Sequence, residues 1–420
     1  MDSETDRRPN DAGETGGPPG DVDPESLPLL EEDVSLVAAE PVIEILELDD
    51  AAVTAAPLDS KYRLPNAGRA FLWVLLLFGS QLVVGLVIGV VLVAMLMAGG
   101  QIQVPRDLSS KIVEESRLID RILVPLATLL TLGTALGVVI LLFRKETARC
   151  MGLRGMTLTQ TVLVLLSVLP CALLASEVTN CASEVLPNIS MDFFAEFAQE
   201  SWWLVFVAAC LFPGLGEELF FRGFLSRGLL AHHGPWLGTL ITAFYFGAIH
   251  LHPIQACGAF ALGLALQFVF LTTRSLWGAI LLHTANNAVA FLAMRYGHLF
   301  PIPGFTTNSP AEPVAEGVPT IHYDEIIKQL NGRGTIAHTS PLLVAATVAV
   351  AAIAWALLRT RTRWLRPDGT EWSRGFLSAE GPRLEESVQT VVGRFDEVTG
   401  SVVLLANVAF FAALYFHVQH

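Results

Sequence analysis

The sequence predicts an all-α protein, a polytopic bundle of about eight transmembrane helices. Three observations lead to this fold class. Hydrophobic residues fill 52% of the 420 positions, charged residues fill only 16%, and the mean hydropathy is +0.53. Soluble domains carry about 25% charged residues. Several apolar runs are also long enough to cross a bilayer core of ~30 Å, in which each segment must pair its own backbone polar groups as a helix does.

The negative charge of the chain is concentrated at its N-terminus. The net charge is −14, yet residues 1–60 hold 17 acidic residues against Arg7 and Arg8, so the rest of the chain is close to neutral. That remainder has no basic surface for nucleic acid, which we exclude as a partner. Residues 1–65 are rich in Asp, Glu, Pro and Gly, a composition that cannot bury enough apolar surface to fold. We expect a disordered acidic tail there.

Apolar runs divide the remaining chain into helical spans and polar connections. The expected regions are N-terminal transmembrane helices in 66–200, a helical core in 201–296, a polar loop in 297–340, and C-terminal transmembrane helices in 341–420 with a cytoplasmic loop at 359–400. The expected spans are 70–97, 122–143, 158–175, 202–230, 236–251, 254–272, 276–294 and 341–358, with a shorter run at 402–416 left open.

Basic residues in the short loops orient the chain. Lys and Arg cluster before the first span, after the second and fourth, between the sixth and seventh, and after the eighth, all on one side of the bundle. An excess of these residues marks the cytoplasmic side. The loop at 106–121 carries four basic residues on the opposite side, accompanied by four acidic ones. We expect a multi-pass protein of the cell membrane, surrounded by lipid, with a cytoplasmic N-terminus.

Three clusters of polar residues interrupt the apolar spans. Ionisable groups are costly inside a membrane, so each is a candidate functional residue. The clusters consist of Glu217, Glu218 and Arg222, then Phe246 and His250, and then His283 and Asn287. Glu218 and Arg222 lie four residues apart and can pair on one helix face, while Glu217 points about 100° away. His283 and Asn287 share a helix face in the same way.

A predicted turn at residues 231–235 places these clusters at similar depths. Glu217 lies 16 residues before His233 and His250 lies 17 after it. In a helical hairpin both therefore sit roughly 20–25 Å from the turn, at about 1.5 Å per residue. The next turn on the same side lies at Arg274, and His283 follows it by nine residues, which places His283 roughly 13 Å from that turn. We expect side chains from three helices to converge, with an imidazole nitrogen within reach of the Glu217 carboxylate directly or through one water.

Two carboxylates, two imidazoles and an amide are suited to hydrolysis. A glutamate with a histidine can deprotonate a water, while a second histidine and an amide can donate hydrogen bonds to a developing oxyanion. Alternatively, histidines and a carboxylate can bind zinc, which activates its own water. Serine chemistry is disfavoured because the sequence has no G-x-S-x-G elbow. The H-E-x-x-H zinc helix and C-x-x-C pairs are also absent from the sequence.

In order and spacing, the three clusters resemble the motifs of the CPBP family, the CAAX proteases and bacteriocin-processing enzymes also called the Abi family. The family pattern is E-E-x-x-x-R, F-x-x-x-H and H-x-x-x-N or D, and the resemblance covers about residues 200–295. It implies an intramembrane endopeptidase that hydrolyses a peptide bond near the cytoplasmic half of the bilayer. The substrates would be peptides or proteins, with prenylated CAAX proteins among the candidates.

The resemblance also implies roles for individual residues. Glu217 and His250 would activate the water, His283 and Asn287 would form the oxyanion hole, and Glu218, Arg222 and Phe246 would support the site. The family has been described both as metal-dependent and as a metal-free glutamate protease. We favour the metal-free mechanism, which requires no cofactor, because an asparagine suits an oxyanion better than zinc. In the zinc alternative, Glu217, His250 and His283 would be the ligands.

Two other functions are compatible with the same sequence. A non-catalytic membrane scaffold or immunity-type factor would use the acidic tail and the extra segments at 307–340 and 360–400 to bind a partner. An ion-coupled transporter would use the buried glutamates and histidines as a proton relay. Transporters often contain inverted repeats, which the sequence does not show.

Overall fold

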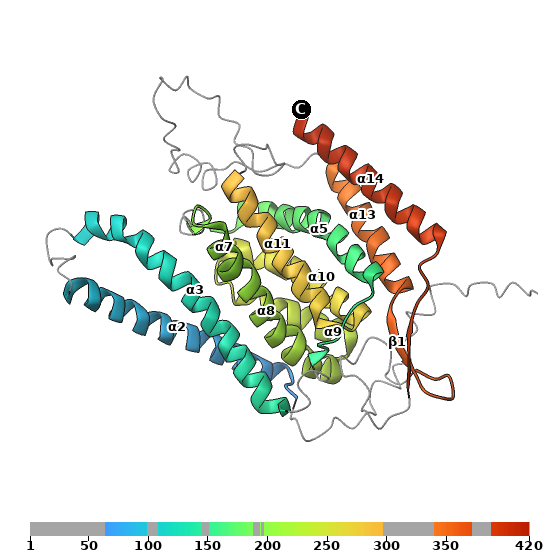
Figure 1. Cartoon of the computed structure of the whole chain (residues 1–420), viewed down its shortest axis with the longest axis horizontal. Coiled ribbons are helices and arrows are strands. Elements are labelled where there is room, and N and C mark those ends of the chain that lie inside the picture. Colours follow the sequence, from blue (N-terminus) through green and yellow to red (C-terminus); the bar gives the residue numbers. More distant parts are fainter. Residues whose placement is uncertain are drawn as a thin grey trace, which may run out of the picture. The chain divides into compact units, whose positions relative to one another are not determined.

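A computed structural model describes residues 64–98, 108–144, 151–187, 194, 197–296, 340–371 and 388–419 (Figure 1). It confirms the all-α fold class. Within these ranges, eight helical segments are long and apolar enough to cross a membrane, and the named strands are two of four residues each. Nearly all of the predicted acidic tail and of the predicted polar loop at 297–340 falls outside the described residues.

Seven of the eight described spans are single helices, six of which correspond to expected spans, and some extend beyond their predicted bounds. These six helices are α2 (Ala67–Ala98), α3 (Leu108–Phe143), α5 (Leu158–Val185), α10 (Pro253–Thr273), α11 (Leu276–Tyr296) and α13 (Ser340–Arg359). The connection expected at 106–121 is helical from Leu108, although the apolar span itself begins only at Pro125, close to the expected 122. The polar residues that suggested a loop instead form the first turns of a helix whose second half is apolar. The run left open at 402–416 belongs to a further helix, α14 (Glu397–Gln419).

The remaining span is a run of helical turns with two kinds of hydrogen bonding. It contains α7 (Trp202–Val205), η4 (Phe206–Leu211), α8 (Phe212–Glu218), η5 (Leu219–Leu225) and α9 (Ser226–Ala248), where η4 and η5 are π-helical. The short helix α8, which ends at Glu218, therefore lies between two π-helical segments. Such segments are rare and occur frequently at functional sites.

The long run reverses direction at Gly234. This residue has a φ of 74°, in the left-handed region that glycine adopts without strain, and Pro235 follows it. A Cβ added to Gly238 would lie 2.8 Å from backbone atoms of Leu229 and Leu230. In a straight α-helix, residues nine apart are separated by about 13.5 Å. Residues 202–248 thus form the predicted helical hairpin, with its turn within the expected 231–235.

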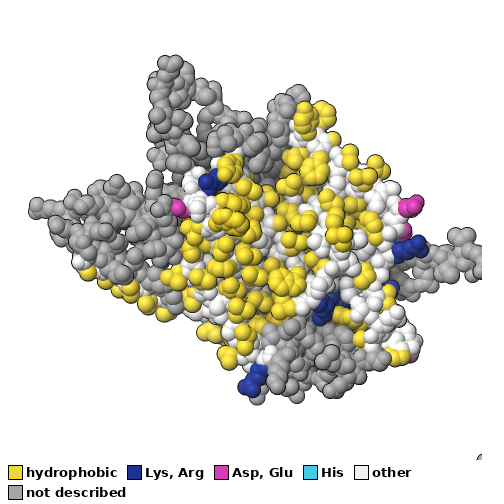
Figure 2. All heavy atoms as spheres, viewed as in Figure 1, with side chains coloured by type: hydrophobic (Ala, Val, Ile, Leu, Met, Phe, Trp, Pro, Cys, Tyr) yellow, Lys and Arg dark blue, Asp and Glu magenta, His cyan; other side chains and the backbone are white. Residues whose placement is uncertain are grey.

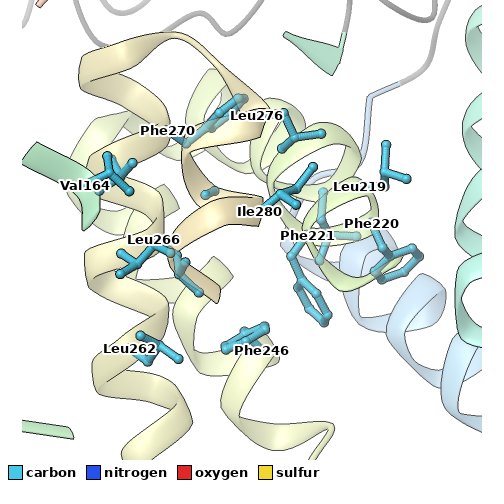
Figure 3. Close-up of a cluster of buried hydrophobic side chains, with 14 of the residues drawn as sticks. Val164, Leu219, Phe220, Phe221, Phe246, Leu262, Leu266, Phe270, Leu276 and Ile280 are labelled. Carbon is cyan, nitrogen blue, oxygen red and sulfur yellow. The ribbon is translucent and has the colours of Figure 1, made fainter. Parts of the chain in front are cut away.

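The hairpin packs among the other helices. α9 and α10 are neighbours, α5 contacts both α10 and α11, and α3 contacts α8 and the flanking π-helical segments. α13 packs between α5 and α14, and α2 packs beside α3 (Figure 1). Aromatic and branched side chains from η5, α9, α10 and α11, including Phe221, Phe246, Phe270 and Ile280, form the centre of the buried core (Figure 3).

The outer surfaces of the helices are apolar. Leu86, Leu141 and Leu405 are 70%, 76% and 68% exposed, respectively, in three different helices. Figure 2 shows hydrophobic side chains covering most of the described part of one face, with few charged groups among them. Because water would disfavour such a surface, the protein belongs in lipid.

A small antiparallel sheet lies between α13 and α14. It pairs β1 (Thr362–Leu365) with β2 (Gln389–Val392) inside the predicted loop at 359–400. Trp364 of β1 is 3% exposed, and the guanidinium groups of Arg154 and Arg274 each lie 4.4 Å from the centre of its ring. These cation–π contacts fix the sheet against the loop before α5 and the turn between α10 and α11.

Candidate active site

A buried ion pair links α8 to η5. Arg222 Nη1 lies 2.7 Å from Glu218 Oε1, and both side chains are fully buried. The pair predicted from the four-residue spacing is therefore present. Arg222 Nη2 donates a hydrogen bond of 2.9 Å to the carbonyl of Gly263, and its guanidinium group lies 4.3 Å from the centre of the Phe246 ring. Partners on α9 and α10 thus hold the arginine in place.

His283 contacts the same carboxylate from α11. Its Nδ1 lies 2.9 Å from Glu218 Oε1, the oxygen that also accepts from Arg222, and its side chain is 3% exposed. The Glu218 carboxylate thus lies between the guanidinium of Arg222 and the imidazole of His283. The sequence led us to expect an imidazole near Glu217, whereas the direct contact in the structure is with Glu218.

The ring of Phe246 connects the two histidines. It is 1% exposed, and it makes edge contacts with His250 and His283 at centroid distances of 5.5 Å each. Phe221 packs against the same ring at 5.4 Å. A Cβ added to Gly263 would lie 3.2 Å from this ring, so the glycine allows α10 to approach α9 closely. Phe246 of the second motif thus contacts the histidines of both the second and the third motif.

His250 lies in the turn after α9 rather than inside a helix. The helix ends at Ala248, and the next helix begins at Pro253. His250 Nδ1 lies 2.9 Å from the carbonyl oxygen of Phe246, which fixes its ring beside the phenyl group. The turn contains Leu251 with a φ of 56°, an uncommon value for a branched residue. Strained backbone of this kind clusters at functional sites.

Asn287 reaches a backbone carbonyl on the facing hairpin. Its Nδ2 donates a 3.2 Å hydrogen bond to the oxygen of Ala209 in η4. This bond ties α11 to the π-helical segment η4, and Asn287 retains a second N–H on the same nitrogen.

Glu217 is half-buried, and one of its oxygens has no protein partner. Its Oε2 is shielded from solvent and accepts no hydrogen bond within the described residues, and the same is true of Glu218 Oε2. Buried polar atoms normally have partners, since an unsatisfied one costs about 1–3 kcal/mol. These two oxygens mark a place where a water or a polar group of a substrate would be stabilised.

Some parts of the site have no signal in the sequence. The Gly263 carbonyl and the Ala209 carbonyl are backbone groups, and only the packing of helices shows that Arg222 and Asn287 reach them. Thr284 also went unnoticed, although its hydroxyl is buried without a partner beside His283. The three glycines 214, 216 and 263 in the apolar helices were the only available hint of close helix approach.

The donor set was also compared with the needs of a metal ion. Among the described residues, no group of three or more His, Cys, Asp or Glu side chains is placed to hold one. The Nδ1 atoms of His250 and His283 are directed at the Phe246 carbonyl and at Glu218, respectively. Glu217, His250 and His283 are not grouped as a set of three ligands among the described residues, and we derive no chemical step through a metal.

Residues 199–289 match the family model described as type II CAAX prenyl endopeptidase Rce1-like. This segment is similar to an Rce1-like domain, the name used for it below. All three motifs fall inside the Rce1-like domain, and the resemblance to the CPBP family is confirmed over that part of the chain. No curated protein and no solved structure was found to match the chain. Together with the apolar helices, the Rce1-like domain supports an intramembrane protease that acts on peptides in a lipid environment.

Proposed function

We propose that the protein is an intramembrane endopeptidase of the CAAX prenyl type. Glu217 and His250 activate water, and His283 and Asn287 stabilise the oxyanion. The observation that carries the proposal is the bonded series Arg222–Glu218–His283, which buries a charged network in an apolar bundle. Such a network is costly to form in a membrane, and its place inside the Rce1-like domain favours catalysis over a purely structural use.

Hydrogen bonding supports the role of His250 as a partner of the water. When the Nδ1–H of His250 donates to the Phe246 carbonyl, the other nitrogen, Nε2, is left as an acceptor. An acceptor nitrogen can orient a water by accepting a hydrogen bond from one of its O–H groups. Glu217, whose Oε2 has no partner among the described residues, can then accept a hydrogen bond from the other O–H group.

His283 is suited to donate to an oxyanion. Its Nδ1 faces the carboxylate of Glu218, so a protonated ring donates Nδ1–H there and keeps Nε2–H for the substrate. Asn287 contributes the N–H that is not used by Ala209. Two fixed donors from one helix face would thus meet the developing negative charge, the arrangement that usually contributes most to acyl-transfer catalysis.

The proposed reaction is a direct hydrolysis. Glu217 takes a proton from the water as its oxygen attacks the peptide carbonyl carbon, and the carbonyl oxygen becomes an oxyanion bound by His283 and Asn287. The C–N bond then breaks, and Glu217 returns the proton to the departing amine nitrogen. The products are a new carboxyl group and a new amino group, so the step consumes one water and leaves the enzyme unchanged.

The short second arm of the hairpin supports a site within the bilayer. Residues 235–248 would measure about 21 Å as a straight helix, which is less than the ~30 Å of a bilayer core. If Gly234 lies near the cytoplasmic boundary, as the basic loops predict, His250 is immersed in the membrane. This position favours substrates whose cleavage site is drawn into lipid, such as a prenylated C-terminus. In the same orientation, the N-terminus of the chain lies on the cytoplasmic side of the cell membrane.

The test uses the purified protein in lipid nanodiscs. A farnesylated CAAX peptide with a fluorescent reporter should be cleaved, whereas Glu217→Gln and His250→Ala should each lower the rate at least about 100-fold. Both variants should keep the wild-type melting temperature within a few degrees. Full activity in Glu217→Gln would refute its role as the general base.

The substrate class needs a second comparison. The same peptide without the farnesyl group should be cleaved more slowly if the lipid anchor carries binding energy. Equal rates would argue against prenyl recognition and leave the peptidase assignment in place. A scaffold would cleave neither peptide, and its cellular effect would survive replacement of Glu217 and His250 together. An ion-coupled transporter would also cleave neither peptide, and it would produce proton flux in liposomes.

A further inference from the structure

The side chain of Thr284 in α11 is placed unlike those of most other helical threonines in this protein. Its hydroxyl is buried, the residue is 9% exposed, and the Oγ1 atom has no hydrogen-bond partner among the described residues. By contrast, Thr131, Thr179, Thr242, Thr272 and Thr347 each donate a hydrogen bond to the carbonyl four residues earlier. Thr284 does not use that intrahelical acceptor, so its hydroxyl is available to another group.

The hydroxyl faces the helix that carries the glutamates. A Cβ added to Gly214 in α8 would lie only 2.3 Å from Thr284 Oγ1, so the missing side chain at Gly214 makes room for this oxygen. Gly214 precedes Glu217 by three residues, and residues at this spacing share a helix face with Cβ positions about 5–6 Å apart. Thr284 therefore borders the same helix turn as Glu217.

The general direction of helical side chains brings Glu217 toward this point. Every Cα–Cβ bond in an α-helix tilts toward the N-terminus, so Glu217 extends over the turn that contains Gly214. Its Oε2 is buried and has no partner in the described part of the chain, and the same is true of the Thr284 hydroxyl. An ionised Glu217 carboxylate oxygen can only accept a hydrogen bond, whereas the Thr284 hydroxyl can both donate and accept one. A water between them would satisfy both groups.

The neighbouring polar residues of α11 already have hydrogen-bond partners, which leaves Thr284 to bind this water. His283 is bonded to Glu218, and Asn287 is bonded to the Ala209 carbonyl. We propose that Thr284 is a further residue of the active site, whose hydroxyl holds the hydrolytic water against Glu217. This inference rests on the proposed peptidase function and adds a residue that lies between the histidine and asparagine of the third motif.

Three variants test the role of the hydroxyl. Thr284→Val keeps the shape of the side chain and removes the hydroxyl, and it should lower kcat about 10- to 100-fold with KM changed less than about threefold. Thr284→Ser retains the hydroxyl and should keep kcat within about threefold of the wild-type value. Thr242→Val is the matched control, because that buried hydroxyl is already bonded within its own helix, and it should leave kcat unchanged.

Stability separates water binding from a structural role. An unpartnered buried hydroxyl does not strengthen the fold, so Thr284→Val should melt at or above the wild-type temperature while turnover falls. A wild-type kcat in Thr284→Val would overturn the proposal. A serine variant as slow as the valine variant would also overturn it, since packing rather than the hydroxyl would then be responsible.

Failure of the peptidase assignment itself would look different. In that case the wild type would be inactive on the test peptides, or Glu217→Gln would be fully active. An experimental structure then decides the inference by direct observation. Water density bridging Thr284 and Glu217 in the wild type, lost in Thr284→Val, supports it, and its absence from the wild type refutes it.

Discussion

His283 Nδ1 lies 2.9 Å from Glu218 Oε1, and the same oxygen accepts from Arg222 at 2.7 Å. One carboxylate therefore aligns a histidine of the third motif and neutralises an arginine of the first. Because all three side chains are at least 97% buried, no solvent is available to replace a lost partner. The motifs are connected energetically as well as spatially.

Removal of the arginine should destabilise the fold. Arg222→Ala leaves the charge of Glu218 without its guanidinium partner, and breaking a buried pair from one side costs about 3–5 kcal/mol. Thermal unfolding in detergent measures the loss. Arg359→Ala is the control, because its pair with Asp396 is about one-third exposed and should contribute no more than about 1 kcal/mol. Equal losses in the two variants would contradict the structural role given to Arg222.

Asn287 should have separable structural and chemical contributions. Asn287→Ala removes the donor to the Ala209 carbonyl, and polar contacts between membrane helices contribute about 1–2 kcal/mol. The rate of peptide cleavage should fall by more than this loss of stability explains, because the oxyanion also lacks its amide donor. A wild-type rate in Asn287→Ala, measured at a temperature where the variant is folded, would assign Asn287 to structure alone.

The response to chelators tests the metal-free mechanism. If Glu217 activates water without a metal, a strong zinc chelator should leave the initial rate of peptide cleavage unchanged after prolonged incubation and removal of free metal by gel filtration. A known zinc protease assayed in the same buffer shows that the chelator is effective. Loss of activity followed by its recovery on adding Zn²⁺ would instead support the alternative in which the metal generates the nucleophile.

The start of α14 should be sensitive to acid. Asp396 Oδ1 accepts hydrogen bonds from the hydroxyl and backbone N–H of Thr399, and these bonds, with help from Arg359, lower the pKa of Asp396 below its ordinary value. A carboxyl group with a lowered pKa stabilises the fold fully above its unfolded pKa of about 3.9, and this contribution is lost as pH falls through the folded value. The wild type should therefore melt higher than Asp396→Asn at pH 7, and the difference should shrink below about pH 4.

The comparison of melting temperatures needs one internal check. Asp368, which lies in the turn after β1, also has a lowered pKa because Thr370 donates to it. Asp368→Asn should therefore be measured in parallel, so that acid sensitivity of the turn is distinguished from that of α14. A constant difference between the wild type and Asp396→Asn across the whole pH range would contradict the capping role.

Local spacing correctly predicted one ion pair and one turn of the structure. The Glu218–Arg222 pair follows from two residues four apart on a helix, and the hairpin turn follows from the Gly234–Pro235 pair between apolar runs. Such features depend on neighbours in the chain, and the sequence contains the necessary information. The start of the second helix was missed, because the polar first turns of α3 do not differ in composition from a loop.

Contacts between residues far apart in the chain could not be predicted from the sequence. The choice of Glu218 rather than Glu217 as the partner of His283 depends on how α8 is rotated between two π-helical segments, which no periodicity reveals. Likewise, His250 was expected within a helix, and the structure places it in a turn whose path is set by the unusual φ of Leu251. Hydropathy alone does not distinguish these alternatives.

The reversal at Gly234 also determines where the two flanks of the bundle emerge. Eight apolar segments, one of them folded into two limbs, would traverse a bilayer an odd number of times. The stretch preceding α2 and the stretch following α14 would then project into different aqueous compartments. Reporter tags that fluoresce or are processed in only one compartment should therefore give opposite signals when attached to the two flanks.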